Sequence, residues 1–361
     1  CGVGWSYWVT WVSYVPSEMI AAGIIMNGFF PEIGTIWWAV FFGLIVTILN
    51  LFRVDKFGES EFWLSLFKVT ALVAFSVVAL FICLGLIGEE GYIGTRILLG
   101  SGGFAPHGYW SIALTMVIIL VNFQGTEIIG LAAGETADPA RSIPTAVRNV
   151  TWRIIALYIV PITLLISILP WDRASLSESV FAAALAEHGF TELAALFSFV
   201  VLTAAISCSN SGLYGAARTV HALATMGMAP RVLEGLSAKG VPSRAIYASI
   251  VFCWGVIAIY AMNPHAAVYT YLLALSGFSG AVAWISICWS QYRRRRRLEA
   301  EGQVELLRYR MPLFPYVTLF GIWAQVFCLA FMIFMPELRS ALYLGVPMLV
   351  VPMIVYRLRR R

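Results

Sequence analysis

Long, nearly uninterrupted apolar stretches, separated by short polar segments, run through the whole chain. A membrane-spanning helix needs roughly 20 mostly apolar residues, and stretches of about that length recur. Ten of them cover residues 5–27, 34–52, 62–87, 109–131, 151–170, 192–212, 245–262, 267–290, 313–335 and 338–356. Apolar and polar residues do not alternate within them, which excludes a transmembrane β-barrel. The pattern predicts an all-α membrane protein with ten spanning helices.

The composition supports this prediction. Of the 361 residues, 60% are hydrophobic and 12% are charged, whereas soluble domains have roughly 45–50% apolar and about 25% charged residues. A water-soluble enzyme, a disordered chain and a disulfide-rich secreted module are therefore excluded. The six cysteines form no CxxC pair, and five of them lie within apolar runs. We interpret them as packing residues.

The Lys and Arg residues are distributed unevenly between the two sets of predicted loops. Twenty of the 24 fall in one set, which includes the C-terminal Arg357, Arg359, Arg360 and Arg361, while the other set contains only Arg96, Arg173 and Arg339. Cytoplasmic loops of membrane proteins carry an excess of these residues. The loops rich in Lys and Arg and the C-terminus are therefore predicted to be cytoplasmic. The first span then runs from the cytoplasmic side to the outside.

A run of five arginines, Arg293–Arg297, follows Trp289 at the end of a predicted span. A basic run at this position matches contact with the anionic lipid of the inner leaflet. It does not require a nucleic-acid partner, and none is predicted.

The chain begins with Cys1 and passes at once into an apolar aromatic run, residues 4–9. This segment has no initiating Met, no charged region and no cleavage site, so it is not a signal peptide. We expect the chain to begin partway through a longer protein.

Three ionisable residues lie well inside the predicted spans: Glu18, Lys68 and Glu127. Each costs at least ~2.5 kcal/mol at the centre of a bilayer, which marks all three as candidates for a functional site. The alternative is a buried pair that only holds helices together. Glu18 follows Pro16, which removes a backbone donor. A carboxyl group and an amine at such depths can exchange protons, so Glu18 and Lys68 are candidates for proton coupling.

The segment Asn122–Glu127 interrupts an otherwise apolar span with four polar residues and Gly125. A glycine costs about 1 kcal/mol in a helix interior relative to alanine. The segment therefore predicts a broken helix whose free backbone groups bind a zwitterion. The alternative is a tight helix crossing at Gly130 and Gly134, and both can hold.

A second polar stripe runs from Ser207 to Gly212. Hydroxyl groups near a helix end often bond only to the carbonyl four residues earlier. The alternative is a wall that lines an ion or substrate site.

Motifs of enzymes are missing or incomplete. The sequence contains no HExxH, Walker A or Rossmann glycine pattern. Gly277-Phe278-Ser279-Gly280 matches the GxSG of intramembrane serine proteases, which also need a histidine in a later span. All four histidines (His107, His188, His221 and His265) precede Ser279. No enzyme activity, metal or cofactor is predicted.

The longest motif is residues 123–135, Phe-Gln-Gly-Thr-Glu-Ile-Ile-Gly-Leu-Ala-Ala-Gly-Glu, followed by Asp138-Pro139-Ala140-Arg141 and Ile143-Pro144. It resembles the sixth helix and following loop of amino acid permeases of the APC superfamily. The similarity is to the bacterial and fungal amino acid transporter family, which includes lysine, aromatic, proline and GABA permeases. Residues 4–8 and the Glu18 region resemble that family's third helix, residues 61–69 its fifth, residues 209–230 its eighth, and residues 276–284 its tenth.

The resemblance implies a leucine-transporter-like bundle of two inverted five-helix repeats plus two further helices, with the substrate site at the bilayer midplane. The ten spans of this chain then correspond to helices three to twelve of twelve, and the first two helices are missing.

The resemblance also implies roles for individual residues. Phe123, Gln124, Gly125, Thr126 and Glu127 would bind the substrate, Glu18 and Lys68 would couple protons, and Ser207 and Asn210 would line the eighth-helix wall. The expected function is import of an amino acid across the plasma membrane, driven by proton symport. The alternatives are an exchanger of amino acids or amines on the same fold and, more remotely, a non-transporting sensor or pore. The identity of the transported amino acid stays open.

Overall fold

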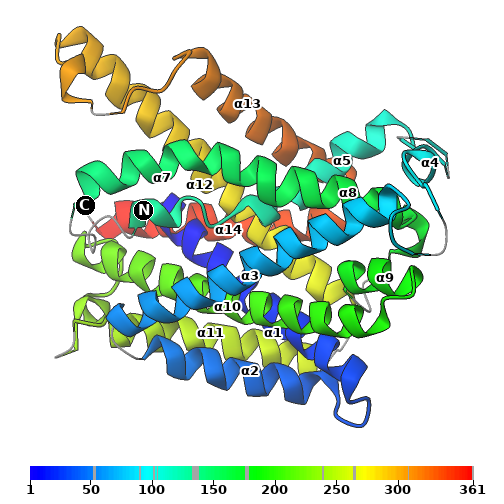
Figure 1. Cartoon of the computed structure of the whole chain (residues 1–361). Coiled ribbons are helices and arrows are strands. Elements are labelled where there is room, and N and C mark those ends of the chain that lie inside the picture. Colours follow the sequence, from blue (N-terminus) through cyan, green and yellow to red (C-terminus); the bar gives the residue numbers. More distant parts are fainter. Residues whose placement is uncertain are drawn as a thin grey trace. The chain divides into compact units, whose positions relative to one another are not determined.

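A computed structural model describes residues 1–51, 54–88, 91–100, 102–103, 105–131, 138–174, 179–237, 240–262, 266–307 and 309–359. Helices joined by turns make up this part of the chain, and it contains no strand (Figure 1). The predicted all-α class is confirmed. The last residues of the permease-like motif, 132–135, lie outside the described residues.

The helices follow one another along the chain with short connections. The α-helices are α1 (Gly2–Phe29), α2 (Thr35–Asn50), α3 (Val54–Cys83), α4 (Arg96–Leu99), α5 (Tyr109–Ile119), α6 (Ile128–Leu131), α7 (Pro139–Ile154), α8 (Val160–Ile168), α9 (Val180–Glu187), α10 (Thr191–Thr225), α11 (Ser243–Met262), α12 (Ala266–Ala300), α13 (Tyr316–Phe331) and α14 (Pro336–Arg359). A 3-10 segment, η1 (Leu120–Phe123), follows α5, and a π-helix (Ile155–Ile159) joins α7 to α8.

Within the described residues, eight helices are long and apolar enough to cross a membrane. They are Gly2–Phe29, Glu61–Cys83, Arg141–Ile168, Thr191–Thr225, Ser243–Met262, Val268–Ala300, Tyr316–Phe334 and Leu338–Leu358. The predicted span at 34–52 corresponds to α2, which is apolar but has only 16 residues. The predicted span at 109–131 is divided among α5, η1 and α6. The count of ten spans stays a prediction.

Several helices extend well beyond the predicted spans, so a number of cations that the sequence placed in loops lie on helices. Arg218 is on α10, and Arg293–Arg297 are on α12. Arginine is a good helix former, and ion pairs four residues apart support the last turns of α12. Arg295 bonds to Glu299 at 2.9 Å and Arg297 to Glu301 at 2.7 Å.

The chain forms two compact units, which we describe separately. The first comprises Cys1–Ser17, Ile112–Val147 and Gly212–Arg361. In this unit α12 packs against both α13 and α14, and α13 turns back along α12 (Figure 1). Gly345 of α14 faces the ring of Phe278 on α12 so closely that a Cβ atom at position 345 would overlap it. Small residues thus allow α12 and α14 to approach closely.

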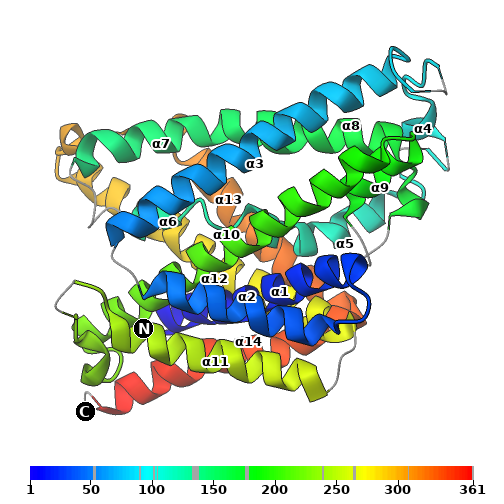
Figure 2. The same ribbon diagram turned by 60° about the horizontal axis from the view of Figure 1, so that its bottom comes forward.

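The second unit comprises Glu18–Ser111 and Arg148–Ser211. In this unit α3 packs along α8, as Figure 2 shows. The core between α3, α8, α9 and the start of α10 centres on Phe75, which is 1% exposed. The ring of Phe75 lies 4.9 Å from the ring of Phe181 and 5.3 Å from that of Phe197, measured between centroids.

We expect Phe75→Ala to destabilise the protein by about 3–5 kcal/mol, because a fully buried ring is lost and its cavity closes only in part. The measurement is the midpoint of thermal unfolding in detergent, which should fall markedly. Leu80→Ala is the matched control, since Leu80 lies on the same helix but is 42% exposed. Equal midpoints for the two variants would contradict this description of the core.

Candidate functional site

The helix around Gly125 is broken. α5 ends at Ile119, η1 covers Leu120–Phe123, a turn covers residues 124–127, and α6 begins at Ile128. Gly125 has a φ of +107°, a value that side-chain-bearing L-residues rarely adopt. The glycine therefore permits the turn, and the predicted interruption of the helical hydrogen bonds at this position is confirmed.

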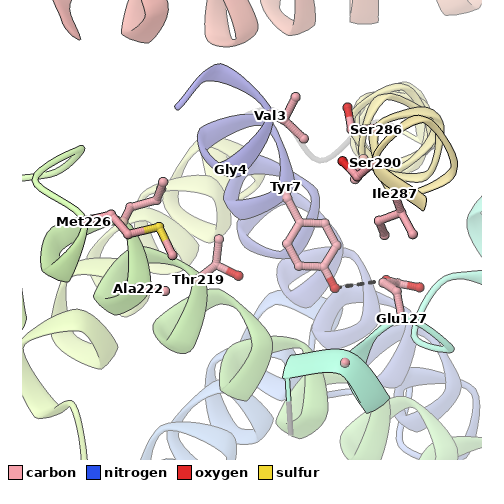
Figure 3. A pocket seen from close by; sticks show the side chains of 13 residues that line it. Val3, Gly4, Tyr7, Glu127, Thr219, Ala222, Met226, Ser286, Ile287 and Ser290 are labelled. Carbon is pink, nitrogen blue, oxygen red and sulfur yellow. Dashed lines mark hydrogen bonds between the residues drawn. The ribbon is translucent and has the colours of Figure 1, made fainter. Parts of the chain in front are cut away.

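The carboxylate of Glu127 folds back onto this turn. The backbone N–H of Gly125 donates to both of its oxygens, at 3.2 Å (Oε1) and 3.1 Å (Oε2). The Tyr7 hydroxyl of α1 donates to Oε1 at 3.0 Å (Figure 3), and the Trp284 indole N–H of α12 donates to Oε2 at 3.0 Å. Three N–H and O–H donors thus hold this one carboxylate in place.

Gln124 points away from this carboxylate and binds α12. Its Nε2 donates to the carbonyl oxygen of Ser276 at 3.0 Å, and its Oε1 accepts the Ser276 hydroxyl at 3.1 Å. A Cβ atom on Gly280 would overlap the Gln124 amide, so the glycine makes room for this contact. Both ends of the amide are engaged, and Gln124 positions the turn against α12.

A cavity of about 540 Å³ opens beside Glu127 (Figure 3). It lies among the N-terminal turns of α1, the end of α10 and α12. Its lining is Val3, Gly4, Tyr7, Glu127, Gly130, Thr219, Ala222, Leu223, Met226, Ala283, Ser286, Ile287 and Ser290. Glu127 supplies the carboxylate in a wall that is otherwise neutral and largely apolar. Pockets for small molecules commonly have volumes of about 300–1,000 Å³ and such a lining.

The five predicted substrate residues do not all reach this cavity. Among them, Glu127 lines it. Gln124 faces Ser276, Thr126 is exposed, and Phe123 is half-buried at the end of η1. Glu18 lies half-buried on α1, two residues after Pro16. The part of Glu18 in proton coupling stays a prediction.

A second polar cluster lies in the other unit, on α2, α3 and α10. Lys68 Nζ donates to Ser207 Oγ at 2.7 Å, and the Ser207 hydroxyl donates to Glu61 Oε2 at 2.6 Å. Asn210 Nδ2 donates to Glu61 Oε1 at 2.7 Å, and Asn50 Nδ2 donates to Asn210 Oδ1 at 2.7 Å. The structure therefore joins three of the predicted residues, Lys68, Ser207 and Asn210, through a carboxylate.

The sequence assigned no role to Glu61, Asn50, Tyr7, Trp284 or Ser276. Glu61 fell one residue before the predicted span 62–87, whereas α3 begins at Val54. Its spacing of seven residues from Lys68 is two helical turns, and this could have indicated that both side chains lie on one face. The polar ends of Tyr7 and Trp284 within apolar runs were a weaker signal of the same kind.

No group of three or more His, Cys, Asp or Glu side chains comes together to hold a metal ion within the described ranges. Glu127 presents a carboxylate to the cavity, and in the second cluster the Lys68 ammonium and the Glu61 carboxylate both bond to the Ser207 hydroxyl.

Comparison with known proteins gives consistent matches over nearly the whole chain. A sequence model of the family described as "Amino acid permease" matches residues 2–361. The chain is 36% identical to the amino-acid permease RocC of Bacillus subtilis over 352 residues, which are 96% of this chain and 75% of RocC. It is 36% identical to the gamma-aminobutyric acid permease of the same organism over 342 residues, 95% of this chain and 72% of that protein. It is 35% identical to the lysine-specific permease LysP of Escherichia coli over 378 residues, 99% of this chain and 76% of LysP.

These relatives are transporters rather than enzymes. Eight apolar helices of spanning length agree with this class, as does the interrupted helix beside a small cavity. The chain therefore belongs to the amino acid permease family and is a multi-pass membrane protein of amino acid transport.

Proposed function

We propose that the protein imports an amino acid across the plasma membrane together with a proton. The observation that carries this proposal is the carboxylate of Glu127, held at the wall of a cavity beside a broken helix. Relatives of this chain include permeases named for lysine and for gamma-aminobutyric acid, which supports a substrate that carries an ammonium group.

Glu127 is proposed to bind the ammonium group of the substrate. An ionised carboxylate has about four lone-pair sites. The Tyr7 and Trp284 donors use one site each, and the Gly125 N–H is shared between the two oxygens. An ammonium group in the cavity would replace one half of this shared contact. The apolar lining, including Met226 and Ile287, would receive the remainder of the molecule.

The distribution of Lys and Arg supports a proposal for the side of the membrane to which this cavity opens. It adjoins the start of α1 and the end of α10, and on α12 it reaches Ser290, shortly before Arg293–Arg297. With the arginine-rich ends and the C-terminus on the cytoplasmic side, the cavity would open to the cytoplasm and serve release of the substrate. Four of these five arginines are exposed, and we propose that they contact anionic lipid of the inner leaflet.

The test is uptake by proteoliposomes that contain the full-length protein. An inwardly directed proton gradient should drive accumulation of at least one amino acid from a mixture of the twenty radiolabelled ones, with acidification of the lumen. Counterflow that does not depend on pH, without net accumulation, would instead identify an exchanger. Ion conductance without accumulation would identify a pore.

Lys68 is proposed to carry a proton during this cycle, together with Glu18. Lys68→Ala should abolish gradient-driven uptake and spare substrate binding, because it removes the ammonium group that bonds to Ser207. Lys68→Arg is the informative partner variant, since a guanidinium keeps the charge and the donors but does not release a proton in proteins. It should also lose gradient-driven uptake. Normal accumulation by the arginine variant would remove proton transfer at Lys68 from the mechanism.

A further inference from the structure

We propose that Glu61 is a second proton-carrying group of this transporter and that it exchanges a proton with Lys68 through the hydroxyl of Ser207. This inference rests on the proposed proton symport. It adds to that proposal a residue and a path.

The helical geometry places Glu61 and Lys68 on the same face of α3 but too far apart along the helix axis for direct contact. Seven residues correspond to nearly two turns of α3 and to an axial distance of about 10 Å. A bridging group is therefore needed, and Ser207 of α10 lies between the two side chains. Ser207 is 1% exposed, so the bridge is shielded from solvent.

The Ser207 hydroxyl accepts on one side and donates on the other. One proton can pass from Lys68 Nζ to Ser207 Oγ while the hydroxyl proton passes from Ser207 to Glu61 Oε2. The ammonium becomes an amine, the carboxylate becomes a carboxylic acid, and serine is regenerated. At 2.7 Å and 2.6 Å, neither transfer requires the heavy atoms to move far.

Both proton states keep their hydrogen bonds. In the first, the ammonium donates to serine and serine donates to the carboxylate. In the second, the carboxylic acid donates to serine and serine donates to the lone pair of the amine. No buried polar group loses its partner in either state, so the transfer avoids the usual cost of an unpaired group.

The amide of Asn210 fixes the other oxygen of Glu61. It donates to Oε1 through Nδ2, while its Oδ1 accepts from Asn50 at the end of α2. Asn210 is 1% exposed and Asn50 is 6% exposed. Because Oε1 is engaged in this way, Oε2 is the oxygen presented to Ser207, and it can gain or lose a proton while Glu61 stays in place.

The elements around α3 supply little competing charge. α8 and the π-helix also pack against α3. Their ionisable side chain, Tyr158, interacts with Cys208 of α10 and with Arg153 of α7. Tyrosine and cysteine are neutral near pH 7. The formal charges within the hydrogen-bonded network itself are those of Lys68 and Glu61.

The experiment compares Glu61→Gln, Ser207→Ala and Ser207→Thr in proteoliposomes of the full-length protein, using the mixture of twenty radiolabelled amino acids. Gradient-driven accumulation and counterflow are measured side by side, and proton entry is followed with a trapped pH-sensitive dye. Glu61→Gln and Ser207→Ala should lose at least tenfold of the accumulation and the coupled proton entry, while counterflow stays within twofold. Ser207→Thr keeps a hydroxyl and should restore coupling.

The matched control is Thr203→Val. Thr203 also lies on α10, but its hydroxyl donates to the Val200 carbonyl of its own helix. The control should accumulate substrate as the wild type does.

Wild-type accumulation by Glu61→Gln or by Ser207→Ala would overturn the relay and leave proton symport standing. Parallel loss of counterflow in both variants would also overturn it, in favour of a structural role. A wild type that accumulates nothing under a proton gradient would overturn the symport, and the relay with it.

Discussion

Replacement of Glu127 by glutamine is expected to weaken binding of the transported amino acid by about 10- to 100-fold. A hydrogen bond to a charged group contributes about 1.5–3 kcal/mol, and each 1.4 kcal/mol corresponds to about tenfold in affinity. The amide also brings donors of its own. The carboxylate is surrounded by donors from Tyr7, Trp284 and Gly125, so an NH₂ group in its place would meet at least one of them and leave it unpaired.

The measurement is equilibrium binding of the amino acid that the wild type accumulates, with counterflow as the transport readout. Glu32→Gln is the matched control, because it makes the same chemical change at an exposed position between α1 and α2. It should bind as the wild type does. Unchanged affinity in Glu127→Gln would show that the ammonium group is bound elsewhere.

Alanine at position 125 is expected to remove most transport without creating a steric clash. The φ of +107° is available to glycine but strained for alanine, and such strain costs about 1–3 kcal/mol. At about tenfold for each 1.4 kcal/mol, the equilibrium constant for forming the turn would fall roughly 5- to 150-fold. A Cβ atom at this position would have no neighbour within 4 Å. The effect therefore reports on backbone conformation alone.

Gly255→Ala provides the comparison for this variant. Gly255 lies in the interior of α11, where an added Cβ atom also meets nothing within 4 Å, and alanine is favoured over glycine in a helix by about 1 kcal/mol. It should leave uptake unchanged and stability equal or higher. If the two variants transport equally well, the left-handed turn at Gly125 has no role in the cycle.

The helical class and the break could be predicted from sequence because both follow from local rules. An apolar run of about 20 residues has few alternatives to a spanning helix. Similarly, polar residues beside a glycine inside such a run indicate an interruption. The partners of these polar residues could not be predicted. Gln124 bonds to a residue 152 positions away and Glu127 to one 157 positions away, and local periodicity carries no information about such contacts.

The place of Glu61 in the second polar cluster could not be predicted from sequence for a different physical reason. The predicted span was bounded by its apolar residues and began at residue 62. The helix α3 itself begins seven residues before Glu61, at Val54. The hydroxyl of Ser207, by contrast, had two open interpretations, a bond to its own helix or a wall for a ligand. In the structure the hydroxyl instead makes two short bonds to side chains of α3. They show it as a bridge between opposite charges.

The two hydrogen bonds between Gln124 and Ser276, together with that between Glu127 and Trp284, attach the turn to α12 at two heights. The two attachment points on α12 are eight residues apart, or a little over two turns. Because of these bonds, we expect a tilt of α12 to move the turn, and a ligand that changes the turn to move α12. Binding of a ligand at the turn would then be coupled to motion of α12. A fluorescent label at the end of α12 distant from the turn would report this binding.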